Sequence, residues 1–145
     1  MTYVDTSALV ALLVNETRSD EVAAWYAQAQ GELVCATWAI TEFGSALGLK
    51  QRTGQLTASN ADEAWKRFER LVANDLDIIV LETSDFHRAA LLSRDSSTGV
   101  RAGDALHLAC AQRVRAESLL TLDAVMARAA SLVGLSIVRL RTSTD

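Results

Sequence analysis

The sequence predicts an α/β fold with a short, mostly parallel five-stranded sheet that is flanked by helices. Short apolar segments rich in Val, Ile and Leu alternate with longer segments in which apolar residues recur at helical spacing. The chain has 145 residues, of which 50% are hydrophobic, so it can bury one core of ordinary domain size. We therefore expect a single domain over residues 1–145.

Five segments have the length and composition of buried strands. They are residues 3–5, 33–37, 77–81, 118–123 and 136–140. Helical patterns fill the intervals, at residues 7–13, 21–30, 38–51, 57–72, 85–94, 102–115 and 124–133. Gly31 and Gly134 follow two of these helices, as expected of C-terminal caps, while Asp20 and Asp85 are expected to cap helix starts. Residues 141–145 are expected to fray.

Composition excludes several classes of protein. The chain lacks a run of about 18 apolar residues, so no membrane span is expected, and its start lacks the basic region of a signal peptide. Cys35 and Cys110 lie far apart in apolar segments, which favours reduced core thiols in a cytoplasmic protein and gives no zinc pattern. A net charge of −4 argues against a general binder of nucleic-acid duplexes.

Two of the predicted strands end in an aspartate that directly precedes a helix. Asp5 closes the first strand and Asp123 closes the fourth. In a parallel sheet both residues lie at the carboxyl edge, where α/β proteins bind ligands. Each aspartate has two explanations, because the same position suits a helix N-cap and a metal ligand.

Two further acids lie on helices that offer them few polar neighbours. Glu42 has Trp38, Ala39, Ser45 and Ala46 three and four residues away, so it either reaches solvent or pairs with a distant group. Asp104 lies in the first turn of a helix that is apolar almost all round. There the helix dipole favours it, and Arg101 is a possible ion-pair partner.

The four acids Asp5, Glu42, Asp104 and Asp123 together suggest a metal site. Four carboxylates at one edge of a sheet repel one another unless cations lie between them. An all-oxygen set suits hard divalent ions such as Mg²⁺ or Mn²⁺. Since no Lys, His or Cys nucleophile accompanies them, the expected chemistry is metal-assisted attack of water on a phosphodiester.

The chain resembles the PIN domains, and within them the VapC-type toxins of bacterial toxin–antitoxin pairs. The resemblance rests on residues 4–9 (VDTSAL), 41–42 (TE), 101–109 (RAGDALHLA) and 121–123 (TLD). It implies a PIN-like three-layer sandwich and an Mg²⁺- or Mn²⁺-dependent endoribonuclease that acts as the toxin of a type II system. It also implies a homodimer, an RNA substrate, inhibition by a cognate VapB-type antitoxin, and contact with DNA only through that antitoxin.

The resemblance makes Asp5 and Asp104 the principal metal ligands, with Glu42 and Asp123 completing the acidic set. Ser7 or Thr121 is expected to orient a ligand or a water by hydrogen bonding. His107 lies one turn after Asp104 and is interpreted as a core or supporting histidine rather than a general base, while His87 is expected at the surface. The aromatic residues Trp25, Tyr26 and Trp38 are either core residues or anchors for the antitoxin.

On this hypothesis the carboxylates hold the metal, and Arg101 is the first candidate for holding a flanking phosphate. Two alternatives remain. A phospho-receiver domain also places acids and Mg²⁺ at strand ends, but it needs an acidic pair after the first strand and a late lysine, and no lysine follows Lys66. A catalytically inactive, protein-binding PIN module would be separated by a cleavage assay.

Overall fold

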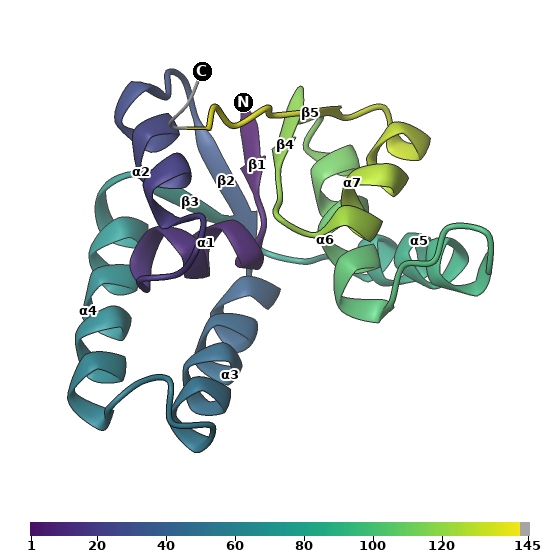
Figure 1. Ribbon diagram of the computed structural model, residues 1–145. Helices are drawn as coiled ribbons and strands as arrows, with labels where there is room; N and C mark the ends of the chain where they lie inside the picture. The colour runs from purple at the N-terminus through teal and green to yellow at the C-terminus, as the bar shows by residue number, and fades with distance from the viewer. Residues whose placement is uncertain (143–145) are drawn as a thin grey trace.

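A central parallel sheet organises the computed structural model, which describes residues 1–142. Its five strands lie in the order β3-β2-β1-β4-β5, and every neighbouring pair is parallel. They are β1 (Thr2–Val4), β2 (Leu33–Ala36), β3 (Leu76–Ile79), β4 (Ser118–Leu120) and β5 (Ser136–Ile137). This sheet confirms the predicted fold class (Figure 1).

Seven α-helices and one 3₁₀ helix occupy the intervals between the strands. They are α1 (Thr6–Leu13), α2 (Ser19–Gln28), α3 (Trp38–Arg52), α4 (Ala58–Asn74), α5 (Thr83–Arg94), α6 (Ala102–Arg113), α7 (Ala124–Ala129) and the 3₁₀ helix Ala130–Val133. Figure 1 shows α1, α2 and α4 on one side of the sheet and α5, α6 and α7 on the other, with α3 and α4 extending below its carboxyl edge. The two helical layers and the sheet form the predicted three-layer sandwich.

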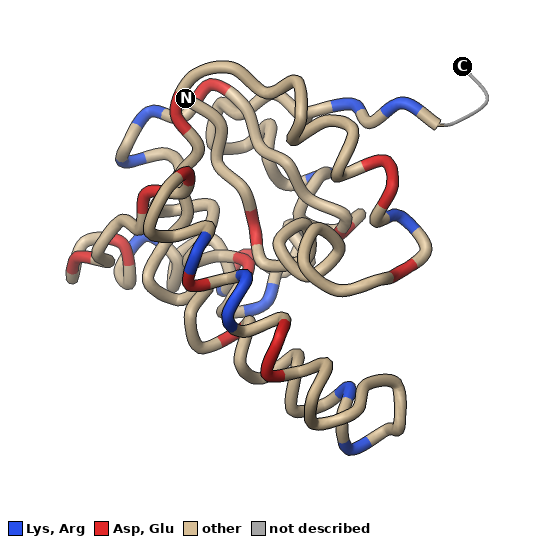
Figure 2. The backbone as a smooth tube through the Cα atoms, turned by 90° about the vertical axis from the view of Figure 1, so that its left-hand side faces the viewer, with Lys and Arg blue, Asp and Glu red and all other residues tan. Residues whose placement is uncertain are grey.

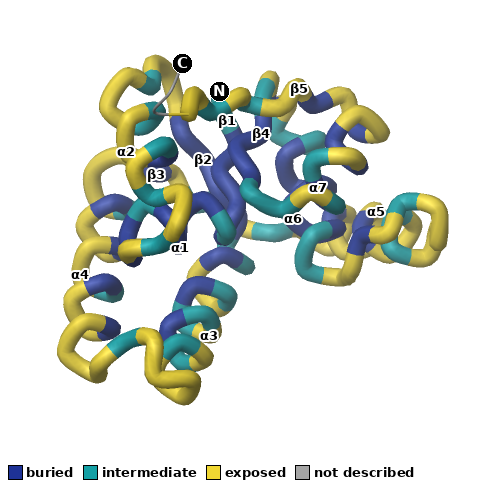
Figure 3. Tube along the Cα trace, in the orientation of Figure 1, coloured by how far each residue is buried: buried dark blue, intermediate teal, exposed yellow. Residues whose placement is uncertain are grey.

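The strands and the inward faces of the helices form the core (Figure 3). The arm made by α3 and α4 has its own aromatic contact, where Phe43 stacks on Phe68 with ring centroids 4.7 Å apart. On the other side Arg113 of α6 donates to both carboxylate oxygens of Asp85 on α5. Asp85 was predicted to cap this helix. It is instead the third residue of α5, and Glu82 is the N-cap.

Several predicted strands are longer than the strands that form. The fourth ends at Leu120 rather than at residue 123, because Thr121 Oγ1 accepts a hydrogen bond from the backbone N–H of Asp123 and turns the chain toward α7. The last strand ends at Ile137 rather than at residue 140. Of the tail expected to fray, residues 143–145 lie outside the described residues.

The topology brings distant segments to the carboxyl edge of the sheet. β1 lies between β2 and β4, so Asp5 follows the central strand. α3 begins directly after β2, and α6 begins at the same edge because it runs back before the parallel strand β4. The first turns of α1, α3, α6 and α7 therefore surround one region, as ligand sites of α/β sheets require.

Charged residues of both signs are interspersed over the helices and loops (Figure 2). No helix within residues 1–142 is long and apolar enough to cross a membrane. Cys35 and Cys110 are both buried and free, as the sequence predicts.

Candidate active site

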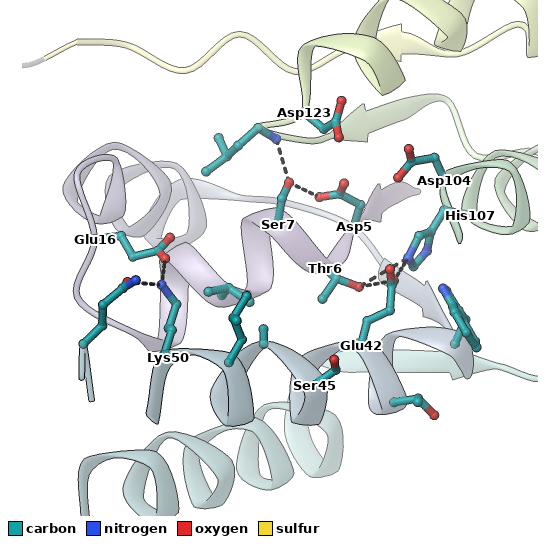
Figure 4. Close-up of a pocket in the computed structure, with 17 residues that line it drawn as sticks. Asp5, Thr6, Ser7, Glu16, Glu42, Ser45, Lys50, Asp104, His107 and Asp123 are labelled. Carbon is teal, nitrogen blue, oxygen red and sulfur yellow. Dashed lines mark hydrogen bonds and ion pairs between the residues drawn. The ribbon is translucent and has the colours of Figure 1, made fainter. Parts of the chain in front are cut away.

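A cleft of about 710 Å³ opens at the carboxyl edge of the sheet and contains all four predicted acids. It is lined by Asp5, Thr6, Ser7, Val10, Glu16, Trp38, Thr41, Glu42, Ser45, Ala46, Leu49, Lys50, Gln55, Asp104, His107, Leu122 and Asp123. Figure 4 shows the carboxylates of Asp5, Asp104 and Asp123 facing a common space, with Glu42 on the other side of Asp5, beside Thr6 and His107.

Asp5 is the most buried of the four acids, with 3% of its surface exposed. One carboxylate oxygen, Oδ1, accepts from Ser7 Oγ (2.6 Å) and from the backbone N–H of Ala8 (3.1 Å). The other, Oδ2, accepts from Thr121 Oγ1 (2.8 Å). Burial raises the pKa of Asp5 although these hydrogen bonds and His107 oppose the shift, so the site favours a cation or a proton at this carboxylate.

Ser7 and Thr121 act together rather than as alternatives. Ser7 Oγ also accepts from the backbone N–H of Leu122 (2.9 Å), which ties α1 to the segment after β4. The two hydroxyls hold the Asp5 carboxylate from both sides, so they fix its orientation in the cleft.

Asp123 combines the two roles that the sequence leaves open, since it is a helix N-cap and also lines the cleft. Its Oδ1 accepts from the backbone N–H groups of Val125 (2.8 Å) and Met126 (3.0 Å) at the start of α7. No hydrogen bond to its Oδ2 is found among residues 1–142. Asp5 is likewise the N-cap of α1. The cap uses one carboxylate oxygen of each residue; Oδ2 of Asp123 remains available to the cleft, whereas Oδ2 of Asp5 also accepts from Thr121 Oγ1.

Asp104 is half-buried in the first turn of α6. Burial raises its pKa, and the charges of Asp123 and Asp5 raise it further, while a backbone hydrogen bond from Arg101 opposes the shift. Within the described chain Asp104 forms no ion pair with Arg101, although the sequence suggested Arg101 as a partner. The electrostatic effect of Asp5 and Asp123 on Asp104 indicates that the three carboxylates share one region of negative potential.

Glu42 is held by groups from two other elements. Its Oε1 accepts from Thr6 Oγ1 (2.7 Å) and forms a short contact with His107 Nε2. Burial acts to raise the pKa of Glu42, but the hydrogen bond and charge of His107, with Thr6 and Trp38, outweigh burial and lower it. Of the two alternatives that the sequence leaves open for Glu42, the structure therefore shows pairing with distant groups.

His107 is buried, with 1% of its surface exposed, and lies in a chain of hydrogen bonds. The backbone N–H of Ala36 donates to Tyr3 Oη (3.0 Å), which lies 2.7 Å from His107 Nδ1. If Tyr3 donates to Nδ1, His107 can donate from Nε2 to Glu42, and every member of the chain has a hydrogen-bond partner. This geometry agrees with a supporting histidine that positions Glu42.

Sequence reasoning missed Tyr3 and Thr6, which hold His107 and Glu42. Tyr3 lies in an apolar strand, and no pattern around it signals a polar role.

Sequence reasoning also missed Gly103. A Cβ at this position would lie 2.9 Å from Trp38 Nε1 and 3.2 Å from Glu42 Oε2. Trp38 Nε1 is buried without a partner of acceptable geometry in the described chain, beside Glu42. Arg101 is the exposed N-cap of α6 and does not line the cleft.

Comparison with known proteins decides the family. The family model of the PIN domain matches residues 2–132. The chain belongs to the PIN domain family. A comparison with curated proteins gives no match. The PIN assignment removes the phospho-receiver alternative, whose sheet has the strand order 2-1-3-4-5 rather than the order observed here.

Several solved structures share this fold. VapC20 of Mycobacterium tuberculosis, described as a sarcin–ricin loop cleaving toxin, is 14% identical with a TM-score of 0.73, over 94% of this chain and 97% of that one. FitAcB of Neisseria gonorrhoeae is 14% identical with a TM-score of 0.70, over 96% and 97%. VapBC2 of Rickettsia felis, bound to a DNA fragment from its promoter, is 14% identical with a TM-score of 0.65, over 97% and 100%. At these identities the likeness establishes the fold.

The carboxylate oxygens of Asp5, Asp104 and Asp123 are the kind of ligand that a hard divalent cation prefers. The three aspartates offer only oxygen, and the repulsion that, after burial, raises the pKa of Asp104 would be relieved by a cation among them. Across residues 1–142 no three His, Cys, Asp or Glu side chains already stand at the spacing of a complete metal-binding group.

Proposed function

We propose that this PIN domain is a metal-dependent endoribonuclease. The observation that carries the proposal is the convergence of Asp5, Asp104 and Asp123 on one side of a cleft at the carboxyl edge of the sheet. Asp5, Asp104 and Asp123, with Glu42 beside them, would hold Mg²⁺ or Mn²⁺. When bound, the metal would lower the pKa of a water and neutralise charge on the phosphate that is attacked.

The chain's own residues supply a prearranged frame for this chemistry. Ser7 and Thr121 fix Asp5 from both sides, and the first turn of α7 fixes one oxygen of Asp123. His107 and Thr6 fix Glu42 at the opposite wall. Such prearrangement lowers the cost of ordering the site when metal and substrate enter.

We also propose that the protein is the toxin of a type II toxin–antitoxin pair, with RNA as its substrate. The support is the fold shared with VapC20, FitAcB and VapBC2 over almost the whole chain. Assembly as a homodimer, inhibition by a cognate VapB-type antitoxin, and contact with DNA through that antitoxin belong to the same proposal. A guanidinium or ammonium group of the antitoxin could enter the acidic cleft, because an arginine can bridge carboxylates in two-point contacts.

A cleavage assay tests the enzymatic proposal. The purified protein should cleave a structured RNA in Mg²⁺ or Mn²⁺ and stop in excess EDTA. Asp5→Asn should lower the rate by about a hundredfold or more, because it removes charge from the most buried carboxylate. Asp62→Asn on the exposed face of α4 is the matched control and should keep the wild-type rate. Undiminished cleavage in EDTA, or in Asp5→Asn, would overturn the proposal. A protein that cleaves no RNA would instead be an inactive binding module.

A further inference from the structure

The cleft extends well beyond the acidic residues, along one face of α3. Glu42, Ser45, Ala46, Leu49 and Lys50 all line it, and their spacing places them on a continuous stripe of the helix. Lys50 follows Glu42 by eight positions, which corresponds to about 12 Å along the helix axis. One end of the cleft is therefore acidic and the other end carries an amine.

Lys50 differs from every other residue that lines this cleft. It is the sole lysine or arginine among the described lining residues. Its side chain is 14% exposed and forms a short ion pair with Glu16, which lies in the loop after α1 and is 30% exposed. Figure 4 shows this pair at the end of the cleft remote from Asp104 and Asp123. Gln55 Oε1 lies 3.4 Å from the Lys50 amine.

The same end opens into a second hollow of about 400 Å³. Glu16, Lys50, Gln55 and Leu122 line both spaces, and Arg18 joins the lining of the second. The two hollows therefore adjoin at the end of the cleft that carries Lys50, where each of the two cations is paired with a glutamate, Lys50 with Glu16 and Arg18 with Glu21. Between these ends Val10, Ala46 and Leu49 present apolar surface.

We propose that Lys50 binds a backbone phosphate of the RNA substrate and that Glu16 occupies the amine until the phosphate replaces it. This inference rests on the proposed function, since it places the scissile phosphate at the acidic end. Phosphates at that end require a divalent cation, whereas a phosphate about 12 Å away along α3 would meet Lys50. A lysine amine suits this role because it is a compact charge with three donors that can rotate from one anion to another.

The alternative is an ion pair that only ties the loop after α1 to α3. The two explanations predict opposite effects of Glu16→Gln on the affinity for RNA. If Glu16 competes with phosphate, Glu16→Gln frees the amine and should tighten RNA binding. If the pair is a structural tie, Glu16→Gln and Lys50→Gln remove the same contact and should act in the same direction.

The experiment measures binding of a fluorescently labelled single-stranded RNA to proteins that carry Asp104→Asn, so that the RNA stays intact. In this background Lys50→Gln should weaken binding about tenfold, as expected for loss of one charge-assisted contact. The slope of log binding constant against log salt should fall by about 0.7, the value for one phosphate of a single strand. Lys66→Gln is the matched control, since it removes the same charge from the exposed face of α4 and should change neither quantity.

Glu16→Gln in the same background should tighten binding severalfold, and Lys50→Arg should retain most of the affinity. Equal weakening by Glu16→Gln and Lys50→Gln, or a salt slope that Lys50→Gln leaves unchanged, would overturn the inference. Thermal unfolding of each variant shows that it is folded. Since binding is read without cleavage, a wild-type protein that binds RNA through Lys50 but cleaves none would refute the nuclease and leave the Lys50 assignment intact.

Discussion

Gly103 gives the sharpest test of how the cleft is built. It is the second residue of α6 and has helical backbone angles, so its conformation does not require glycine. Its surroundings do, because an added Cβ would lie 2.9 Å from Trp38 Nε1 and 3.2 Å from Glu42 Oε2. The indole is rigid and its Nε1 is buried, so Gly103→Ala must displace α6, Trp38 or Glu42.

The size of the effect follows from two opposing contributions. Overpacking of this kind costs about 1–3 kcal/mol, while replacing a helical glycine by alanine gains about 1 kcal/mol. Gly103→Ala should therefore lower the free energy of unfolding by about 0–2 kcal/mol, or the melting temperature by about 3 °C for each kcal/mol. Cleavage should fall about tenfold or more, since displacement of a site group by about 1 Å costs up to about a hundredfold.

Gly44→Ala is the matched comparison. It lies within α3, and a Cβ there would lie 3.7 Å from the ring of Trp65, an ordinary contact. This variant should be more stable than the wild type by about 0.5–1 kcal/mol and should cleave at the wild-type rate. Urea unfolding and cleavage rates measured side by side decide the matter. Equal stabilisation of both variants with unchanged cleavage would refute the reasoning about the Gly103 contact.

Two further predictions concern ionisable residues of the site. A raised folded-state pKa means that the charged form of Asp104 destabilises the fold above that pKa and ceases to do so below the unfolded value of about 3.9. In EDTA, Asp104→Asn should therefore be more stable than the wild type at pH 7, and the gain should vanish near pH 4; a gain independent of pH in thermal melts would contradict this. His107→Gln should lower stability by about 1–3 kcal/mol, because it disrupts buried partners, while the exposed control His87→Gln should not. Loss of a kinetic pKa near 6–7 in the pH–rate profile of His107→Gln would instead identify a general base.

Local patterns were sufficient to predict the architecture. The alternation of apolar segments with helical periodicity depends on neighbours in the sequence, and it predicted the parallel sheet and most helix positions. The positions of Asp5 and Asp123 followed from the same pattern, because a strand that ends at an acid and continues as a helix places the acid at the carboxyl edge.

Contacts between remote segments could not be predicted in this way. Glu42 is paired with His107, which is 65 residues away, and Lys50 with Glu16, which is 34 residues away. No periodicity links such residues, so the sequence left open whether Glu42 has a partner at all. The fourth strand was predicted to be too long for a related reason. The hydroxyl of Thr121 accepts from the backbone N–H of Asp123 nearby and donates to Asp5, which is 116 residues away, and only the tertiary fold brings Asp5 there.

Because Glu42 and Lys50 lie at different distances from the start of α3, a tilt of this helix would move them by different amounts. From Trp38 at its start, Glu42 lies about 6 Å along the axis and Lys50 about 18 Å. A tilt of about 5° about that start would move Glu42 by about 0.5 Å and Lys50 by about 1.6 Å. Small changes where α3 rests on α4, such as at Phe43 and Phe68, would thus widen or narrow the remote end of the cleft threefold more than the acidic end. The affinity for the RNA that we propose to bind in the cleft would then depend on the packing between α3 and α4, while the carboxylates stay nearly in place.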